Sequence, residues 1–246
     1  MLNLSEVFYS LQGEGPCTGH PAIFVRTAGC NLNCGQERGA EWKCDTWNVM
    51  RNTHIKVSPE DLFPKYIEPL YKYPSRIVFT GGEPLLQAAD LAAAIEQIIN
   101  NDKMLYAAEN IDLETNGTIY SEDVYKQVGG IVSVSPKLAN SHIPLEKRFK
   151  EDVLGNIFKK NVNYYPILKL VVAAVADVTE IRERYIPFLR QVYPIDWNMH
   201  LYLMPAMEDV PDSQGIKQFV WTVCEELHVP MSLRAQIETF GRKTGV

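Results

Sequence analysis

The sequence lacks an apolar run long enough to cross a lipid bilayer, and it has little positive charge. A transmembrane helix needs about 20 consecutive apolar residues. The 24 lysines and arginines are outnumbered by 30 aspartates and glutamates, which gives a formal net charge of -6. A nucleic-acid-binding surface needs a basic footprint, so this balance argues against broad contact with phosphate backbones. An anionic small substrate would have to be bound by a few local cations.

Cysteine is also scarce, with five in 246 residues, and the odd number argues against a full set of disulfide bonds. No secretory signal precedes the first residues, Met1 to Asn3. Cys17 and Cys224 are far apart and have no partner pattern, so we expect each to be a small buried apolar residue. These features together lead us to expect a cytosolic protein.

The remaining cysteines, Cys30, Cys34 and Cys44, lie within fifteen residues and predict a metal site. By themselves they leave two kinds of site open. A structural zinc ion needs a fourth ligand, and the nearest candidates, His20 and His54, have no recognised zinc-ligand spacing. A [4Fe–4S] cluster held by three thiolates keeps one iron without a protein ligand, and that iron can chelate a small molecule.

The Gly81 to Pro84 segment (Gly-Gly-Glu-Pro) shifts the balance toward iron–sulfur chemistry, because it follows a predicted strand downstream of the cysteines. Three cysteines followed by this segment resemble the radical S-adenosylmethionine superfamily, whose usual spacing is C-x3-C-x2-C. The first interval is regular here. Residues 35–43 stretch the second interval and form a polar, charged insertion in a cluster loop that spans residues 30–46. Cys44 is still expected to be the third ligand, because Asp-Thr follows it directly, as in the family pattern.

Short β-branched strands alternate with helical stretches along the chain, without a linker or a low-complexity break. Ser58 predicts the start of one helix, since Pro59 and two acidic residues follow it in the first turn. The predicted strands are 22–26, 76–80, 111–115, 131–134, 167–173 and 199–204. The predicted helices are 58–71, 90–100, 145–159, 178–191 and 213–227.

About six strands in βα alternation predict an α/β fold with a parallel sheet covered by helices. Six repeats are too few to close an eightfold barrel, so we expect an open, partial (β/α) barrel in a single domain, residues 1–246. Functional residues of such barrels gather at the carboxyl ends of the strands. Four candidate segments follow predicted strands: Cys30, residues 80–82, residues 114–116 and residues 135–137. Each would be an ordinary turn if taken alone, but four at one sheet edge indicate a site.

Segments spread over nearly the whole chain are similar to those of the 7-carboxy-7-deazaguanine synthase family. The first is Glu6 to Gly15 (EVFYSLQGEG), and the last is Phe240 to Val246 (FGRKTGV). The matching segments between them are 19–32, 44–46, 80–84, 114–117, 134–137 and 168–172. The cysteines and Gly-Gly-Glu-Pro identify only the superfamily, whereas Leu-Gln-Gly-Glu-Gly and the Asp-Thr after Cys44 indicate the family.

The resemblance implies a carbon–nitrogen lyase of queuosine and 7-deazapurine synthesis. It would contract the ring of 6-carboxy-5,6,7,8-tetrahydropterin to 7-carboxy-7-deazaguanine and release ammonia. In this family a 5′-deoxyadenosyl radical takes a hydrogen from the substrate carbon that bears the carboxylate, and the hydrogen is later returned. The implied cofactors are a [4Fe–4S] cluster, S-adenosylmethionine and Mg2+. A flavodoxin or ferredoxin is the expected electron donor, and relatives are homodimers.

The resemblance also implies roles for individual residues, although it assigns no acid–base catalytic side chain. The three cysteines would hold the cluster, and Thr46 would give one oxygen to Mg2+, whose other sites go to substrate and water. Arg26 would pair with the substrate carboxylate. The substrate would contact Leu11, Gln12, Gly13, Glu14, Arg26, Thr80, Glu114, Gln236 and Val246. S-adenosylmethionine would contact Lys43, Cys44, Asp45, Gly82, Glu83, Ser135, Pro136 and Lys137.

The C-terminal tail, residues 231–246, is expected to cap the substrate, and it departs from the family at one position. Counting back from the end of the chain, Gln236 stands where family members commonly carry histidine. A glutamine can hydrogen-bond to a substrate, but it cannot shuttle a proton near neutral pH. The resemblance therefore implies a substrate contact at Gln236 and leaves an acid–base role there open.

Two other functions stay open on the sequence. One is a radical S-adenosylmethionine enzyme with a different substrate, such as an activating enzyme that makes a glycyl radical. The pterin-contact set, Gln12, Glu14, Arg26 and Glu114, argues against it. The other is a non-catalytic α/β module stabilised by zinc, which metal analysis of anaerobically purified protein would distinguish.

Overall fold

A single mixed sheet runs through the described part of the chain. The computed structural model describes residues 1–35, 44, 46–47, 49–52, 55–72, 75–101, 108–206, 213–241 and 245. Within these ranges the strand order is β3-β1-β2-β4-β5-β6-β7-β8. The strands are β1 (Leu2–Leu11), β2 (Pro21–Thr27), β3 (Ile55–Val57), β4 (Arg76–Gly81), β5 (Ile111–Thr115), β6 (Ile131–Val134), β7 (Tyr165–Val172) and β8 (Leu201–Pro205).

Six neighbouring strands, β2 and β4 to β8, run parallel to one another. A parallel sheet is covered by its crossover helices, so its strands are rich in buried apolar residues. In β4, for example, Ile77, Val78 and Phe79 are all fully buried. The sheet does not close on itself, because β3 and β8 are its two edges in the described residues. This confirms the predicted open, partial (β/α) barrel with six parallel strands.

Two antiparallel strands, β1 and β3, extend the sheet beyond β2, and neither was predicted. Along β1, Glu6, Phe8 and Ser10 face the cavity that lies at the centre of the fold, whereas Val7 and Tyr9 pack against the core. This alternation is the period-two signal of a strand with two different faces. The residues of β1 therefore carry the sequence signal of a strand in the same segment that resembles the family.

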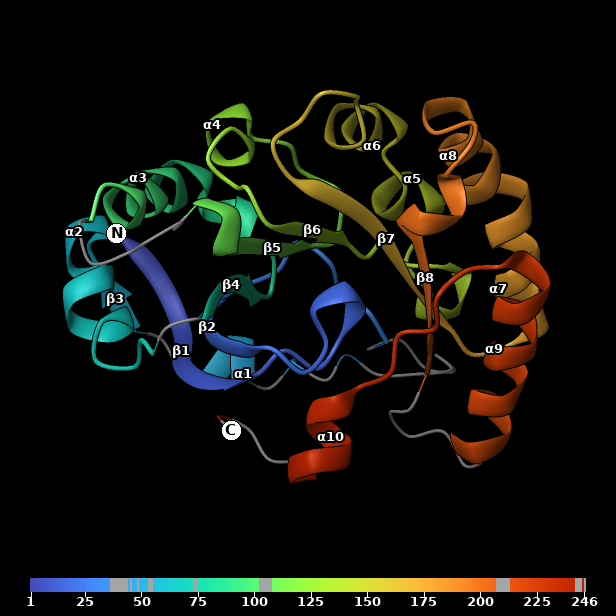
Figure 1. Ribbon diagram of the computed structural model, residues 1–246, viewed down its shortest axis with the longest axis horizontal. Coiled ribbons are helices and arrows are strands. Elements are labelled where there is room, and N and C mark those ends of the chain that lie inside the picture. The colour runs from blue at the N-terminus through green and yellow to red at the C-terminus, as the bar shows by residue number, and fades with distance from the viewer. Residues whose placement is uncertain are drawn as a thin grey trace.

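Helices cover the outer side of the sheet (Figure 1). The longer ones, α3 (Ala88–Ile99) and α9 (Ser213–Leu227), agree closely with two predicted helices. The shorter ones are α1 (Val49–Asn52), α2 (Pro59–Leu62), α4 (Glu122–Tyr125), α5 (Leu145–Arg148), α6 (Glu151–Ile157), α7 (Val175–Glu180), α8 (Ile186–Val192) and α10 (Ala235–Phe240). Across the described ranges, no helix combines the length and the apolar character that a membrane span requires.

The prediction of one helix over residues 145–159 is wrong, because two helices lie there. Phe149 has extended backbone (φ -120°, ψ 115°) and ends α5. The acidic residues Glu151 and Asp152 then stand in the first turn of α6. Negative charge at a helix N-terminus is stabilising, so the sequence favours a second start at this point.

Two other predicted helices contain a wider π turn next to a proline. In the predicted helix 58–71, α2 is followed by a π turn over Phe63–Ile67, which contains Pro64. In the predicted helix 178–191, a π turn separates α7 from α8, directly before Pro187. Proline has no backbone N–H and cannot donate the regular helical hydrogen bond, so the local hydrogen bonding is rearranged.

The inner side of the curved sheet remains open, and α10 lies there (Figure 1). The main apolar core lies between the sheet and the outer helices. A second, small apolar cluster contains Leu32, Cys34, Ile143, Val171, Met204 and Ala206. It lies on the inner side, where the carboxyl ends of the parallel strands meet, and it marks the place where function is expected.

Candidate functional site

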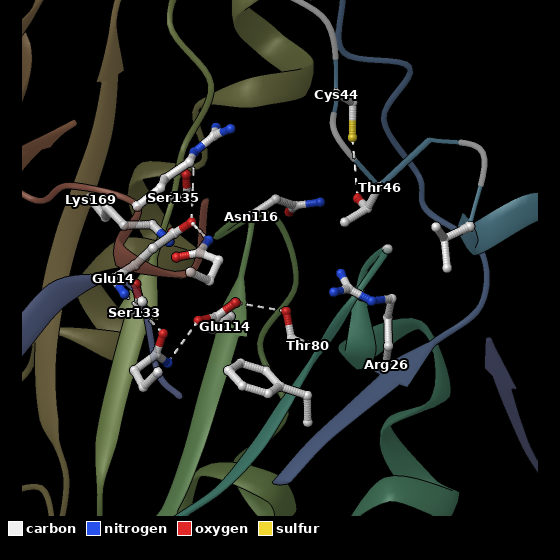
Figure 2. A pocket seen from close by; sticks show the side chains of 18 of the residues that line it. Glu14, Arg26, Cys44, Thr46, Thr80, Glu114, Asn116, Ser133, Ser135 and Lys169 are labelled. Atoms are coloured by element: carbon white, nitrogen blue, oxygen red, sulfur yellow. Dashed lines mark hydrogen bonds and ion pairs between the residues drawn. The ribbon is translucent and has the colours of Figure 1, made fainter. Parts of the chain in front are cut away.

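The carboxyl ends of the parallel strands surround one cavity of about 360 Å3. Its wall includes residues from β1, β2, β4, β5, β6 and β7, and from the C-terminal segment that contains α10. Figure 2 shows polar side chains from several of these strands pointing into the same space. A concave site with convergent polar groups is the usual form of a small-molecule site.

Most residues predicted for the site line this cavity. They are Leu11, Gln12, Gly13, Glu14, Arg26, Cys30, Cys34, Cys44, Thr46, Thr80, Gly82, Glu114, Ser135, Lys137 and Gln236. Glu83 and Pro136 do not line it. The predicted residues that lie outside the described ranges are Lys43, Asp45 and Val246, together with residues 36–43 of the insertion.

The three clustered cysteines gather at the small apolar cluster. Cys34 is buried in it, and Cys30 and Cys44 pack against it. Burial raises the pKa of the Cys34 thiol to about 11; the Lys137 ammonium opposes this rise, and the thiols of Cys44 and Cys30 add to it. The three thiols thus lie close enough to influence one another, in apolar surroundings with one nearby cation. Such a group fits a bound metal cluster, which would stabilise the thiolates that it requires.

Zinc and an iron–sulfur cluster require different arrangements of the thiols. In the described part of the chain, no three His, Cys, Asp or Glu side chains are grouped as ligands of one metal ion. A tetrahedral zinc ion holds each sulfur at about 2.3 Å and therefore draws its ligands close together. A cubane cluster binds each thiolate at a different iron, so its ligands need not converge on one point.

Gly81 allows strands β2 and β4 to approach closely at the cavity rim. Its φ is 122°, and a Cβ atom there would collide with the backbone of Thr27. Gly82 donates its N–H to the Thr27 carbonyl at 3.1 Å. Glycine is required for such a backbone, so the first residue of the predicted Gly-Gly pair has a structural reason. The turn exposes Gly82 to the cavity.

Glu83, a predicted contact of S-adenosylmethionine, directs its side chain into the fold. It is fully buried, and its carboxylate accepts hydrogen bonds from Leu85 N (3.1 Å), Thr115 Oγ1 (2.8 Å) and Asn116 N (2.8 Å). Burial raises the pKa of Glu83, although these donors act against the rise. The residue thus links the end of β4 to the end of β5 and supports the cavity wall from behind.

Gln12, Thr80 and Glu114 form one hydrogen-bonded group on the cavity wall. Thr80 Oγ1 donates to Glu114 Oε2 at 2.7 Å, and Gln12 Nε2 donates to Glu114 Oε1 at 3.3 Å (Figure 2). The Gln12 amide oxygen accepts from the Glu14 backbone N–H at 3.1 Å. The carboxylate of Glu114 is therefore held in place and keeps acceptor capacity for a ligand N–H.

Arg26 is held at the cavity by two neighbours from β1. Its Nε donates to Glu6 Oε1 at 2.8 Å, and its guanidinium lies 5.7 Å from the centre of the Phe8 ring. The side chain is 17% exposed, so it is not a free surface cation at a strand end. An arginine bound through Nε can still present its two terminal nitrogens to a carboxylate in a bidentate pair.

Glu14 lies among several polar groups from distant parts of the chain. Lys169 Nζ forms a hydrogen-bonded ion pair with Glu14 Oε2, and Gln236 Nε2 donates to Glu14 Oε1 at 3.2 Å. Arg234 Nε lies 3.7 Å from the same Oε1. Burial by itself would raise the pKa of Glu14, but the two cations outweigh it and lower the pKa to about 2. Glu14 is therefore ionised at neutral pH.

Thr46 lies beside Cys44 at the cavity, and their side chains are 3.3 Å apart (Figure 2). Its hydroxyl oxygen is a hard, neutral atom of the kind that Mg2+ accepts as a ligand. A metal ion bound there would have to take its remaining oxygens from the substrate and from water.

The C-terminal tail packs on the loop that follows β1. Ala235 N–H donates to the Gly13 carbonyl at 2.9 Å, and Gly15 N–H donates to Ser232 Oγ at 3.0 Å. The Gln236 amide lies so close to Gly13 that a Cβ atom at Gly13 would overlap it. The absence of a side chain at Gly13 thus permits the tail to form part of the cavity wall.

Sequence reasoning missed Lys169, Arg234 and Glu6 as residues of the cavity wall, whereas Asn116 belongs to the predicted segment 114–116. A signal existed for Lys169, because it is the one charged residue in the otherwise apolar core of β7 (YPILKLVV). A buried strand seldom carries an unpaired cation, so this lysine implied a buried acidic partner. Arg234 had no comparable signal, since a cation before a short helix is common on protein surfaces.

Comparison with known proteins places this fold and cavity in a family. A family model described as a 4Fe-4S single cluster domain matches residues 11–154. The 7-carboxy-7-deazaguanine synthase of Rhodopirellula baltica is 30% identical, and the match covers 99% of this chain and 88% of that protein. The chain belongs to the 7-carboxy-7-deazaguanine synthase family. The match to the cluster domain also favours an iron–sulfur cluster over structural zinc at the three cysteines.

Other relatives of the same name match over a shorter length. The 7-carboxy-7-deazaguanine synthase of Halobacterium salinarum is 37% identical over 141 residues, which are 57% of this chain and 47% of that protein. The chain spans about half the length of this relative and of others that it matches.

Solved structures show the same fold. The crystal structure of QueE from Escherichia coli superposes with a TM-score of 0.65 at 22% sequence identity, covering 94% of this chain and 93% of that one. The structure of native anSMEcpe with bound AdoMet and Kp18Cys peptide gives a TM-score of 0.51 at 18% identity. It covers 91% of this chain and 67% of the other. Both agree with the open, partial barrel described above.

We expect Gly13→Ala to loosen the tail, because the added methyl group would occupy the place of the Gln236 amide. The Ala235 amide donates to Gly13. Its hydrogen–deuterium exchange should become about tenfold faster, which corresponds to roughly 1.4 kcal/mol of lost local stability.

The control is Gly155→Ala in α6, where a Cβ atom meets no neighbour. It should leave exchange at Ala235 unchanged. Combining Gly13→Ala with Gln236→Ala should restore part of the protection, because the overlapping side chain is removed. Wild-type exchange in Gly13→Ala would mean that the tail does not pack on this glycine in solution.

Proposed function

We propose that this protein is a 7-carboxy-7-deazaguanine synthase that contracts the ring of 6-carboxy-5,6,7,8-tetrahydropterin and releases ammonia. The observation that carries the proposal is the composition of one cavity. It combines three clustered cysteines with two carboxylates, a glutamine and an arginine at the strand ends. Loss of ammonia accounts for every atom by which product differs from substrate, so the overall reaction needs no net oxidant.

The cysteines would hold the cluster that the family match implies. A [4Fe–4S] cluster with one open iron supplies an electron at low potential for cleavage of S-adenosylmethionine. Cys30, Cys34 and Cys44 would be its three protein ligands. Lys137 influences both Cys30 and Cys34, since its charge opposes the rise in their pKa values that burial causes. A cation beside the thiolates would partly balance the negative charge of the bound cluster.

S-adenosylmethionine would lie against the ends of β4 and β6. Gly82 lines the cavity without a side chain, so the methionine amino group could approach its backbone. Lys137 Nζ donates a hydrogen bond to Ser135 Oγ at 3.2 Å, so the Lys137 ammonium group lies next to the Ser135 hydroxyl. We assign Lys137 to the methionine carboxylate and Ser135 to the ribose. Glu83 would act from behind the wall, because its carboxylate is used by Thr115 and Asn116.

The pterin would lie over Gln12, Glu14, Thr80 and Glu114. The two carboxylates accept hydrogen bonds, and the reduced pterin offers several N–H groups along its edge. Arg26 would pair with its carboxylate, for which the planar guanidinium is suited. Gln236 would contact the substrate from the tail. Arg26 would thus be the cation that pairs with the single negative charge of the substrate, in a protein whose net charge is -6.

We infer three further properties from family membership. A flavodoxin or ferredoxin would reduce the cluster, two copies of the chain would form a homodimer, and the protein would work in the cytosol, where clusters persist. Reduction of the purified protein by flavodoxin tests the first property. Sedimentation equilibrium tests the second, and a monomer at micromolar concentration would contradict it. Fractionation of cells tests the third.

The proposed reaction is tested directly by product analysis under anaerobic conditions. Reduced protein with S-adenosylmethionine, Mg2+ and 6-carboxy-5,6,7,8-tetrahydropterin should yield 7-carboxy-7-deazaguanine and ammonia. Little S-adenosylmethionine should be consumed, because the hydrogen is returned. Arg26→Ala should raise the KM for the pterin by roughly 10- to 100-fold, since a hydrogen bond to a charged group contributes about 1.5–3 kcal/mol.

Arg190→Ala is the matched control for charge, because Arg190 stacks on Trp197 and does not line the cavity. It should leave the KM unchanged. If the wild-type protein cleaves S-adenosylmethionine but leaves this pterin intact, the proposed substrate is wrong and only the radical S-adenosylmethionine chemistry of the superfamily stands. The glycyl-radical activating type of enzyme would then be the next function to test.

We expect the iron content to depend on the three cavity cysteines. Protein isolated anaerobically should contain about four iron and four sulfide per chain, as in other [4Fe–4S] proteins. Cys44→Ala should lose most of both, because a cluster left with two protein ligands is released. Cys17→Ala should retain both, since Cys17 lies outside the cavity wall. About one zinc and no iron in the wild type would contradict the cluster, and full iron in Cys44→Ala would contradict this ligand.

We expect turnover to require Mg2+ and Thr46→Ala to weaken its effect. Removing one neutral oxygen ligand should raise the Mg2+ concentration for half-maximal rate without changing the melting temperature, because Mg2+ keeps its other ligands. Thr222→Ala on the exposed face of α9 is the control. Full activity in a chelator, or a wild-type Mg2+ response in Thr46→Ala, would refute the assignment.

A further inference from the structure

Glu14 is surrounded by groups from three separate parts of the chain. It belongs to the loop after β1, Lys169 comes from β7, and Arg234 and Gln236 come from the start of α10. Lys169 and Arg234 are each only 6% exposed. Lys169 and Glu14 are 155 positions apart in the sequence, so the tertiary fold brings them together.

The arrangement leaves Glu14 with capacity for one more donor. An ionised carboxylate offers about four lone-pair positions. Lys169 uses Oε2, and Gln236 and Arg234 both approach Oε1. Among the described residues these are the only groups within 4 Å that pair with its side chain in an ion pair or hydrogen bond. Glu14 also lines the cavity, so a ligand there has access to the remaining position.

The charge of Glu14 also fixes the orientation of Gln236. Because the carboxylate only accepts, the amide of Gln236 must direct its nitrogen toward Glu14 and its oxygen away. That oxygen is buried and has no hydrogen-bond partner within the described part of the structure. It lies against Gly13, beside the cavity. A second acceptor therefore stands next to Glu14; unlike Glu14, it has no donor among the described residues, and its neighbours cover it.

The charges around Glu14 explain why it stays ionised although it is buried. The groups that face it are Lys169 and Arg234, and Glu114 acts on Lys169 from β5. Desolvation opposes the charge of Glu14, and the two cations overcome that opposition. Without Lys169, Arg234 at 3.7 Å would remain as the cation next to Glu14. Desolvation, which raises the pKa of Glu14, would then be opposed by one cation instead of two.

We propose that Lys169 is a positioning residue that keeps Glu14 a charged acceptor and thereby makes this wall of the cavity specific for a ligand that presents two adjacent N–H donors. Glu14 and the Gln236 amide oxygen are the two acceptors that it would meet. The pairing rests on the proposed function, because the 2-amino-pyrimidinone edge of the reduced pterin is such a donor pair. Lys169 itself does not touch the reacting carbon in this arrangement.

The test compares Lys169→Met with Lys169→Arg over a range of pH. In the wild type Glu14 stays ionised, so it should contribute no change in the KM for 6-carboxy-5,6,7,8-tetrahydropterin between pH 4.5 and 7.5. In Lys169→Met burial should raise the pKa of Glu14 above its ordinary value of 4.5. The variant loses the ionised acceptor as pH falls, so its KM relative to Lys169→Arg should rise toward acid pH and be about twofold or more higher at pH 4.5, where at least half of Glu14 is protonated. Its kcat should change much less.

A second measurement needs neither substrate nor turnover. In protein labelled with 13C at the glutamate carboxyl carbons, the Glu14 signal is identified by its loss in Glu14→Gln. In the wild type this signal should not titrate down to about pH 4, and in Lys169→Met it should titrate at least about one pH unit higher than in the wild type. Lys169→Arg should resemble the wild type. This measurement remains valid if Lys169→Met binds substrate poorly.

The outcomes separate the inference from the proposed function. A wild-type Glu14 signal with a midpoint at or above 4.5 overturns the inference even if the pterin is turned over. A KM that rises equally at all pH values in Lys169→Met overturns it as well, because Lys169 would then contact the substrate directly. If the wild type leaves the pterin intact but the Glu14 signal behaves as expected, the proposed substrate fails and the charge arrangement stands.

Discussion

A carboxylate inside a protein needs cations or hydrogen-bond donors around it, and this requirement organises the cavity. Three glutamates meet it in different ways. Glu14 is paired with Lys169 and approached by Arg234. Glu114 accepts from Thr80 and Gln12, and Glu83 accepts from backbone and hydroxyl donors at the end of β5. Each glutamate joins elements that are distant in sequence. The ion pairs and hydrogen bonds of these carboxylates therefore hold the cavity wall together.

The three glutamates differ in what they leave for a ligand. Glu83 is fully buried and its oxygens are occupied by the protein, which makes it a support for the wall. Glu14 and Glu114 line the cavity and keep acceptor positions directed into it. The three residues also stand at different places: Glu14 follows the antiparallel strand β1, Glu114 lies within β5, and Glu83 comes shortly after the end of β4. Burial agrees with this division, because Glu83 is fully buried whereas Glu14 and Glu114 are partly exposed.

The parallel strands provide the frame for these groups. Their carboxyl ends meet at one edge, so short segments after β2, β4, β5 and β6 contribute to one space. The antiparallel strand β1 adds a further wall, where Glu6 and Phe8 hold Arg26. The tail closes part of the open side by packing on Gly13. A cavity built from so many elements needs the complete sheet, and the family relationship over 99% of the chain is consistent with that need.

The sequence by itself determined the six parallel strands, the cysteine group and most of the cavity residues. The strands have a local signal in β-branched runs and the cysteines in their clustering, whereas most of the cavity residues came from the resemblance to the family. The tertiary structure alone decided that Glu83 turns inward, that residues 145–159 form two helices, and that Lys169 and Arg234 meet Glu14. The reason is physical: an ion pair between residues 155 positions apart depends on how the sheet curves, and no short-range pattern in the sequence records that distance.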